Sequence, residues 1–497
     1  MSSFRCLLLL CLVVSSAWAQ RPSQRSVETA LSEAGALVQA GRLEEAETAT
    51  RNLLTTSPGS AEAHSLLGVI LDQRGRTGEA EKEYDTALRL KPKLVSALTN
   101  FGVLLARTNR TAEAIAKFEE VLRIEPTHER AIFNLGTLYA ARGDYKRAAP
   151  LLEKAGGPAA LFTLALKLAE AHEYAEAVRL FQRTNELRPQ TFEVLYNLGL
   201  ALYNLDRLDE AQQAMSSAAV LKPAEADPYY RLGLIASAQG DTKAALTHWT
   251  KALELRPVFA EANFMIGEEL LKRQLAEKSI PFYERALQQA HGELVYYLRL
   301  GVANVRGQRY DRARQVFTDA LQRYPDNANL YFLLGYAGRA EGQYDQAVEA
   351  FKQALKLQPD NADVLSNLGY IASQRGENAE AERLLRRAIQ LDPKSFPSYH
   401  DLGRLLVKLR RYDEALPLLT RGAELNAKDP GVHYQLFLAY SRLKQKDQAD
   451  RELAEFKRLD EVNKHGATPM AGPVKDGENL PPLPTAAAGD SAKPRTP

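Results

Sequence analysis

The side chains that most often carry out chemistry are scattered along this sequence rather than gathered into motifs. His128-Glu129 and His172-Glu173 begin the zinc motif H-E-x-x-H, but neither has the second histidine. The sequence also lacks G-x-S-x-G, a phosphate loop ending in Gly-Lys-Ser or Gly-Lys-Thr, and G-x-G-x-x-G. It therefore predicts a protein that is not an enzyme and that holds no metal ion and no cofactor.

The first residues have the layout of a cleavable secretory signal. Residues 1–19 place one basic residue, Arg5, before a short apolar run, and small residues follow up to Ala19. The run is shorter than the roughly 20 residues of a membrane-spanning helix, and no later stretch is long and apolar enough to span. A lipoprotein acylated at Cys11 is less favoured, because Leu10 stands where a small residue is usual. We expect an exported protein, periplasmic or secreted.

Both cysteines of the chain, Cys6 and Cys11, lie within this predicted signal. After cleavage the protein would contain no cysteine, and it could form no disulfide. A thiol nucleophile and a cysteine-ligated zinc site are excluded for the same reason. We expect its stability to come from core packing alone.

Three residue types recur every 34 positions with constant offsets between them: a proline series from Pro58, an alanine series from Ala46 and a glycine series. Each period holds two stretches with the apolar spacing of helices. The small residues recur where two helices should cross, and a bulky residue four positions after most of the alanines should fill the space beside the crossing. The glycine series consists of Gly68, Gly102, Gly136, Gly199, Gly233, Gly267, Gly301, Gly335, Gly369 and Gly403.

The pattern L-G…A-x3-F…P at this spacing resembles the tetratricopeptide repeat (TPR). The resemblance implies an all-α fold, an α-solenoid in which antiparallel helix pairs stack into a right-handed superhelix. It also implies a concave groove lined by the first helix of each pair. Thirteen repeats fit the sequence, at residues 27–60, 61–94, 95–128, 129–157, 158–191, 192–225, 226–259, 260–293, 294–327, 328–361, 362–395, 396–429 and 430–463.

The segments around and within this array differ in composition. Residues 20–26 are a predicted linker, and residues 464–497, rich in Pro, Gly and Ala, are a predicted disordered tail. Leu480–Pro484 in that tail could dock as a polyproline ligand, although a plain flexible tail is favoured. The repeat at 129–157 is five residues short and ends in Gly156-Gly157, so we expect a shortened second helix and a local change of curvature there.

First-helix residues three positions before the glycine series should point into the groove, and the fourth to eighth repeats all carry an aromatic there. Asparagine or arginine often follows at the next position. Asparagines in this place resemble the ladder by which some TPR proteins hold a peptide backbone, because an amide both donates and accepts hydrogen bonds. The predicted partner-binding residues are Phe133, Phe162, Tyr196, Asn197, Tyr230, Arg231, Phe264, Arg299 and Phe332. The alternative is that the aromatics pack against the neighbouring repeat's first helix.

The carboxylate clamp of chaperone-binding TPR domains can be compared with this sequence position by position. Asn197 and Arg231 fit two of its five places. The other three are occupied by Phe162, Leu166 and Asp227, which cannot supply the clamp's cationic and amide groups. The sequence therefore does not support binding of chaperone tails.

The charges of the chain are nearly balanced. Lys and Arg number 64 against 62 Asp and Glu, a net charge of +2, which favours neither nucleic acid nor an anionic membrane as a partner. With no catalytic motif, the sequence favours a protein–protein interaction scaffold that binds peptide-like segments in its groove. The alternative is an accessory subunit of an envelope polysaccharide, outer-membrane-biogenesis or secretion assembly. The sequence does not indicate an oligomeric state.

Overall fold

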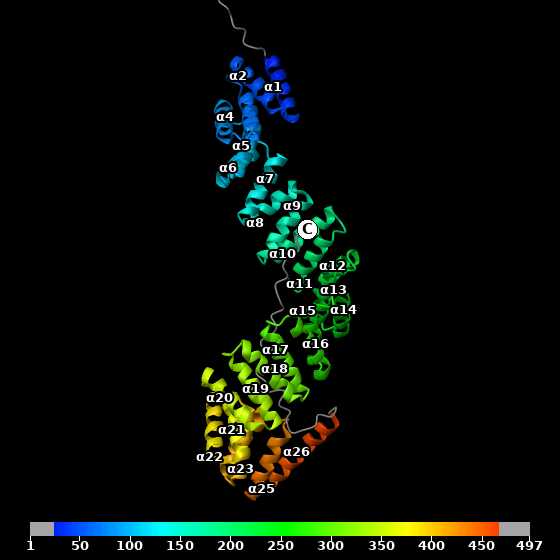
Figure 1. Cartoon of the computed structure of the whole chain (residues 1–497), viewed down its shortest axis with the longest axis vertical. Helices are drawn as coiled ribbons and strands as arrows, with labels where there is room; N and C mark the ends of the chain where they lie inside the picture. Colours follow the sequence, from blue (N-terminus) through cyan, green and yellow to red (C-terminus); the bar gives the residue numbers. More distant parts are fainter. Residues whose placement is uncertain (1–23, 467–497) are drawn as a thin grey trace, which may run out of the picture. The chain divides into compact units, whose positions relative to one another are not determined.

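The protein is described by a computed structural model that covers residues 24–466 (Figure 1). Across this range the chain forms 26 α-helices joined by short turns, with no β-strand, so the predicted all-α solenoid of helix pairs is confirmed. The helices divide between an N-terminal unit that ends at Leu221 and a C-terminal unit that begins at Lys222. The predicted signal, and the part of the predicted tail after residue 466, lie outside the described residues.

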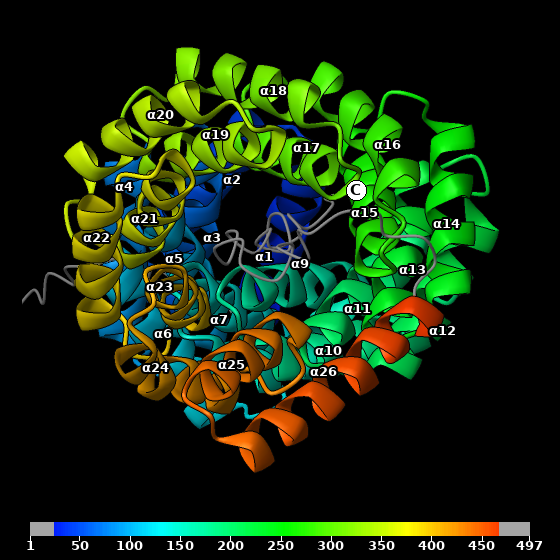
Figure 2. The same ribbon diagram turned by 90° about the horizontal axis from the view of Figure 1, so that it is seen from below.

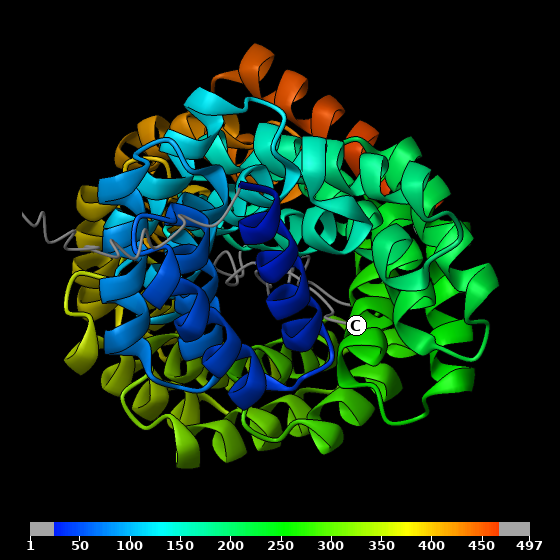
Figure 3. The ribbon, with the colours of Figure 1, turned by 90° about the horizontal axis from the view of Figure 1, so that it is seen from above.

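The N-terminal unit stacks helix pairs in sequence order, and consecutive pairs lie side by side (Figure 3). Odd-numbered helices are the first helices of the repeats and even-numbered helices are the second. Its helices are α1 (Gln24–Gln39), α2 (Leu43–Thr56), α3 (Ala61–Gln73), α4 (Thr77–Leu90), α5 (Val95–Arg107), α6 (Thr111–Ile124), α7 (Glu129–Ala141), α8 (Tyr145–Ala155), α9 (Gly157–Glu170), α10 (Tyr174–Leu187), α11 (Phe192–Asn204) and α12 (Leu208–Leu221).

The C-terminal unit continues the same alternation. Within it, the first helices from α15 to α25 form an inner row and the second helices form an outer row (Figure 2). Its helices are α13 (Ala226–Ala238), α14 (Thr242–Leu255), α15 (Ala260–Lys272), α16 (Ala276–Gln289), α17 (Leu294–Arg306), α18 (Tyr310–Arg323), α19 (Ala328–Glu341), α20 (Tyr344–Leu357), α21 (Ala362–Arg375), α22 (Asn378–Leu391), α23 (Phe396–Lys408), α24 (Tyr412–Leu425), α25 (Pro430–Arg442) and α26 (Lys446–Gly466).

The glycine series marks the crossing of the two helices in a repeat, as its spacing predicts. A Cβ added at Gly68 would lie 2.7 Å from Tyr84, and one added at Gly335 would lie 2.8 Å from Phe351. Ordinary van der Waals contact begins near 3.4 Å. The ring of the second helix therefore fills the space that a side chain on the first helix would need, and only glycine leaves that space open.

The turn between the two helices carries one residue with positive φ in every repeat. This conformation is strained for residues with a Cβ, and glycine adopts it freely. Six of the thirteen positions are glycine and the other seven are not, so this series cannot be found in the sequence by looking for one recurring residue type. The residues are Gly41, Gly75, Asn109, Gly143, His172, Asp206, Gly240, Gln274, Gln308, Gly342, Gly376, Arg410 and Lys444.

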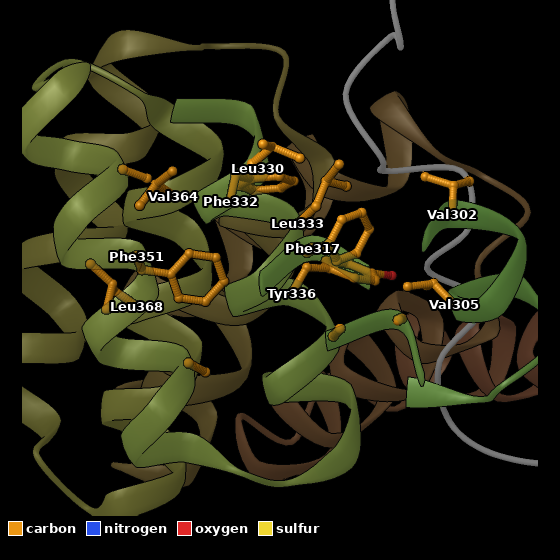
Figure 4. Packing of buried hydrophobic residues seen from close by; sticks show 14 of the residues in the cluster. Val302, Val305, Phe317, Leu330, Phe332, Leu333, Tyr336, Phe351, Val364 and Leu368 are labelled. Atoms are coloured by element: carbon orange, nitrogen blue, oxygen red, sulfur yellow. The ribbon is translucent and has the colours of Figure 1, made fainter. Parts of the chain in front are cut away.

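Buried apolar side chains of neighbouring repeats join into shared clusters. In the C-terminal unit one cluster extends from Val302 and Val305 of α17 to Val364 and Leu368 of α21 (Figure 4). Phe351 of α20 lies in its interior and is fully buried. Each repeat thus contributes side chains to a core that no single helix pair could form alone.

Three boundaries bear on the predictions for the flanking segments and the short repeat. Helix α1 begins at Gln24, inside the predicted linker, and α26 runs to Gly466, three residues past the predicted end of the array. Both extensions are free of proline, so nothing stops the helix from continuing. Helix α8 has 11 residues where most second helices have 14, as the shortened repeat predicts.

Candidate functional site

Five of the six predicted groove aromatics are buried in the core rather than exposed. Their exposed fractions are 3–7 %, and only Phe133 on α7 reaches 40 %. Three of them lie against the bulky residue of their own repeat's second helix. The ring-centroid distances are 5.8 Å for Phe162–Phe181, 5.7 Å for Phe264–Tyr283 and 6.0 Å for Phe332–Phe351.

The other contacts of these aromatics continue the packing. The Phe264 ring also lies 5.0 Å from Tyr296 on the next first helix, and the Tyr230 ring lies 4.9 Å from Phe259. The Tyr196 ring stacks on Phe192 of the same helix, at 5.7 Å. Core packing therefore accounts for these rings, but the predicted contact with the neighbouring repeat's first helix is seen for Phe264, whereas Phe162 and Phe332 pack against their own repeat's second helix. The predicted aromatic stripe is reduced at the surface to Phe133. The five buried aromatics face the core, so a partner could not reach them without opening the helix pair.

The predicted asparagines bond first to their own helices. The Asn197 side chain is buried, and its Nδ2 donates to the Glu193 carbonyl at 2.8 Å. Asn134 and Asn367, at the same position of their repeats, donate to the carbonyl four residues earlier at 2.7 and 2.8 Å. This local bond fixes the side chain and takes one of the amide donors that a peptide ladder would use.

The two predicted arginines are both held by neighbouring side chains. Arg231 lies over the Tyr230 ring, 5.3 Å from its centroid. Arg299 Nε lies 2.9 Å from Glu268, and the Tyr283 hydroxyl donates to the same carboxylate at 2.6 Å. Arg299 is therefore part of an ion pair within the C-terminal unit, and six of the nine predicted residues are buried instead of lying at a surface.

A different group of side chains comes together across α19, α21 and α23 of the inner row. Two guanidinium groups lie over the Tyr370 ring, with Arg339 4.9 Å and Arg404 5.1 Å from its centroid. Arg339 also lies 5.2 Å from the Tyr336 ring on its own helix. We call Arg339, Tyr370 and Arg404 the Arg–Tyr–Arg stack. Each comes from a different repeat, and all three are partly exposed.

The repeat geometry explains why these residues meet. Tyr370 and Arg404 directly follow Gly369 and Gly403, whose missing side chains face Leu385 and Leu419 of the second helices. In an α-helix the next residue is turned by about 100°, which here directs it toward the neighbouring first helices. Tyr336, Tyr370 and Arg404 are 34 residues apart, so their common position in the repeat was the signal in the sequence that could have found them.

One carboxylate accompanies the stack. Asp401 Oδ1 lies 3.1 Å from Arg404 Nη2 and 3.6 Å from His400 Nδ1. Burial alone would raise the pKa of the Asp401 carboxyl, but His400 and the charges of Arg404 and Arg339 outweigh it and hold the pKa below its usual value. Asp401 is therefore ionised at neutral pH and helps to fix Arg404 in place.

The stack suits binding better than catalysis. Burial raises the pKa of the Tyr370 hydroxyl, so the side chain is neutral at neutral pH and its ring attracts the guanidinium groups that lie over it. Within residues 24–466 no three or more His, Cys, Asp or Glu side chains are grouped so as to hold a metal ion. The helices of the described range include none with the length and apolar character needed to cross a membrane.

Comparison with solved structures places several helical-repeat proteins beside this chain. Tom70 from yeast is 16 % identical, with 88 % of this chain and 100 % of that chain covered and a TM-score of 0.35. The C-terminal part of a TPR repeat-containing protein from Cytophaga hutchinsonii is 17 % identical, with 48 % and 99 % covered and a TM-score of 0.44. YrrB, described as a TPR protein with an unusual peptide-binding site, is 24 % identical, with 36 % and 95 % covered and a TM-score of 0.30.

Comparison of the sequence with family models identifies the family more directly than comparison with solved structures. No curated protein matches the chain. Two family models described as tetratricopeptide repeat match it in both units. One matches residues 31–94, 162–228, 230–293, 298–342 and 400–464, which is more than half of the chain, and the other matches residues 105–161 and 339–406. Together with the helix pairs and their glycine crossings, these matches show that the chain belongs to the tetratricopeptide repeat family.

Proposed function

We propose that this protein is a non-enzymatic scaffold that binds a peptide-like segment of a partner protein along the inner row of its C-terminal unit. Tetratricopeptide repeats indicate a protein–protein interaction scaffold. The observation that supports this particular surface is the Arg–Tyr–Arg stack, in which three repeats present charged and aromatic groups side by side and partly exposed. Arginine and tyrosine are among the residues enriched where protein partners bind.

The surroundings of the stack suit an extended chain. Asn367 lies one helical turn before Tyr370, on the same side of α21. Its Nδ2 bond to Asp363 uses one of two donor hydrogens, so its remaining amide groups can pair with a peptide backbone. An apolar ring face, flanking guanidinium groups and an amide on adjacent helices give a surface that contacts both the backbone and the side chains of a bound segment.

Site-specific photo-crosslinking tests this proposal. A benzophenone amino acid is placed at Asn367 on the inner row and, as the matched control, at exposed Lys352 on the outer helix α20 of the preceding repeat. The full chain is then irradiated in the native fraction that contains its partners. We expect a discrete crosslinked protein from Asn367 and none from Lys352. Equal crosslinking from both positions, or crosslinking from Lys352 alone, would place binding elsewhere and refute the proposal.

We also propose that the chain is exported, which rests on the signal-like layout of residues 1–19. Cleavage after Ala19 would leave Gln20 as the first residue of the mature protein. N-terminal sequencing of the protein purified from its native host tests this directly. A chain that retains residues 1–19 and remains inside the cytoplasm would refute export by a cleaved signal.

A further inference from the structure

We infer that the last repeat carries a docking surface for a proline-rich segment of the same chain, Leu480–Pro484. The surface consists of Tyr434 and Phe437 of α25 and Phe456 of α26, which we call the terminal aromatic patch. The segment lies outside the described residues and follows them along the chain. This inference is separate from the proposed function, which concerns α19, α21 and α23.

The three rings of the terminal aromatic patch lie against one another. The Tyr434 ring centroid is 6.1 Å from that of Phe437 and 5.2 Å from that of Phe456. Tyr434 is 40 % exposed, and the other two side chains are partly exposed. Tyr434 has the same repeat position as Phe264, whose ring is buried and lies against Tyr296 of the next first helix. Within the described range no first helix follows α25, so the corresponding ring stays open.

An exposed aromatic patch is unusual at the end of a repeat array. Terminal repeats generally present a polar outer face, because no neighbouring repeat covers them. Phe437 moreover stands at the position of the glycine series, where ten other repeats have no side chain at all. Adjacent exposed apolar side chains commonly mark a surface that another segment covers. The question is therefore which segment has the matching chemistry and can reach the patch.

Leu480–Pro484 has the chemistry that aromatic surfaces recognise. Its sequence, Leu-Pro-Pro-Leu-Pro, contains the P-x-x-P pattern and carries no charge. Such segments favour the polyproline II helix, which loses little entropy on docking, and they bind to surfaces lined by aromatic rings. That helix has three residues per turn, so Pro481 and Pro484 would contact the rings from one edge. Proline donates no backbone hydrogen bond, but its carbonyl can accept one from a tyrosine hydroxyl such as that of Tyr434.

The connecting chain is long enough to bring the segment to the patch. Gly466, at the end of α26, lies ten residues beyond Phe456, which corresponds to about 15 Å along the helix. Leu480 lies fourteen residues beyond Gly466, and a chain of that length can span up to about 46 Å. A tether that can reach makes docking intramolecular, so modest contacts are sufficient. This favours the chain's own segment over a second copy or a separate protein.

Photo-crosslinking within the purified full chain tests the inference. A benzophenone amino acid at Tyr434 keeps an aromatic ring in the patch. The matched control carries it at Lys457, which is exposed on α26 and directly follows Phe456, so its tether to the segment is nearly the same. After irradiation and digestion with trypsin, we expect Tyr434 to be linked to the peptide of residues 476–495, with a yield at least about fivefold higher than from Lys457.

Two double variants with the probe at Tyr434 separate docking from the mere proximity of a tethered chain. Pro481→Ala/Pro484→Ala removes the P-x-x-P pattern and should lower the crosslinking yield about fivefold or more. Pro494→Ala/Pro497→Ala removes the second P-x-x-P pattern of residues 464–497, which lacks leucine, and should change the yield by less than about twofold. Protein labelled with heavy nitrogen, mixed with unlabelled protein, should give crosslinks only within one chain.

Hydrogen exchange provides a second readout that needs no probe. A docked segment stabilises the last repeat, and a docked-to-free ratio of about three slows its opening about fourfold. Backbone amides of α25 and α26 should therefore exchange about fourfold faster in Pro481→Ala/Pro484→Ala than in the wild type. Amides of α1 and α2, in the first repeat, should exchange at an unchanged rate.

Several results would overturn the inference. These are no linkage of Tyr434 to residues 476–495, equal linkage from Lys457, or an unchanged yield or unchanged exchange in Pro481→Ala/Pro484→Ala. Crosslinks between labelled and unlabelled chains would also overturn it and would assign the terminal aromatic patch to a second copy. The crosslinking test at Asn367 uses a different surface, so the proposed function stands or fails separately.

Discussion

Replacing Gly335 with alanine tests whether the glycine series marks a true steric contact between α19 and α20. The new Cβ would lie 2.8 Å from two atoms of the Phe351 ring. Ordinary contact begins near 3.4 Å, so the ring or the helix must move by 3.4 − 2.8 = 0.6 Å. Phe351 is fully buried within the cluster of Figure 4, among the side chains that its ring would have to displace.

The expected free-energy change is the difference of two opposing effects. Overpacking a well-packed core costs about 1–3 kcal/mol. Alanine is favoured over glycine inside a helix by up to about 1 kcal/mol. Because Phe351 is fully buried, the overpacking cost falls in the upper part of its range, about 2–3 kcal/mol, and we expect Gly335→Ala to destabilise this repeat by about 1–2 kcal/mol. The double variant Gly335→Ala/Phe351→Leu should be less destabilised than the sum of its single changes, because the smaller side chain relieves the overlap.

Hydrogen exchange of backbone amides is the suitable assay, because repeat arrays open locally as well as globally. Amides of α19 and α20 should exchange about 5- to 30-fold faster in Gly335→Ala, which corresponds to 1–2 kcal/mol. The control is Gly78→Ala on α4, where no atom lies within 4 Å of the added Cβ, so the same substitution should slow local exchange. Unchanged or slower exchange at Gly335→Ala would refute the steric explanation of the glycine series.

Three further predictions concern ion pairs, turns and pH. Glu47 is buried and bonded to three arginines, so Glu47→Gln should lower the free energy of unfolding, measured by urea titration, by about 1–3 kcal/mol. Glu79 forms an exposed ion pair, so the control Glu79→Gln should change this free energy by less than about 1 kcal/mol. Gln274→Gly, at a turn with φ of 60°, should raise the melting temperature by relieving about 1 kcal/mol of strain, and Gly342→Ala should lower it. The pKa of Asp401 is lowered in the folded protein, so its ionised carboxylate stabilises the fold. The difference in the free energy of unfolding between the wild type and Asp401→Asn should be largest near pH 7 and should shrink as the pH falls below about 4. A difference that does not change with pH would contradict this.

The sequence was sufficient to predict the repeats, because their signals are local. The crossing at Gly68 and Tyr84 needs one small and one large residue 16 positions apart, and helix periodicity sets that spacing. The short α8 likewise follows from the missing residues before Gly156. The turn conformation at residues such as Arg410 was not predictable from residue type, because a backbone forced by two flanking helices can hold any residue there.

The sequence could not show which first-helix residues face a partner. That depends on how each helix is rotated against the next repeat, and one position along a helix turns a side chain by about 100°. The prediction placed Phe332 in the groove, whereas Phe332 is buried and Tyr336, four residues later, contacts Arg339 of the stack. Arg404 and Tyr370 went unrecognised because they belong to different repeats, and only the packing between repeats brings their side chains together.

The Arg–Tyr–Arg stack takes one side chain from each of three successive repeats, and this division has a mechanical consequence. The three side chains come from three neighbouring first helices, so a force that moves these helices apart pulls the guanidinium groups away from the ring. Conversely, a ligand that bridges the three side chains ties the repeats together and resists extension. Occupancy of the stack and stiffness of this part of the solenoid are therefore coupled, and tension on the protein would set how tightly a partner is held.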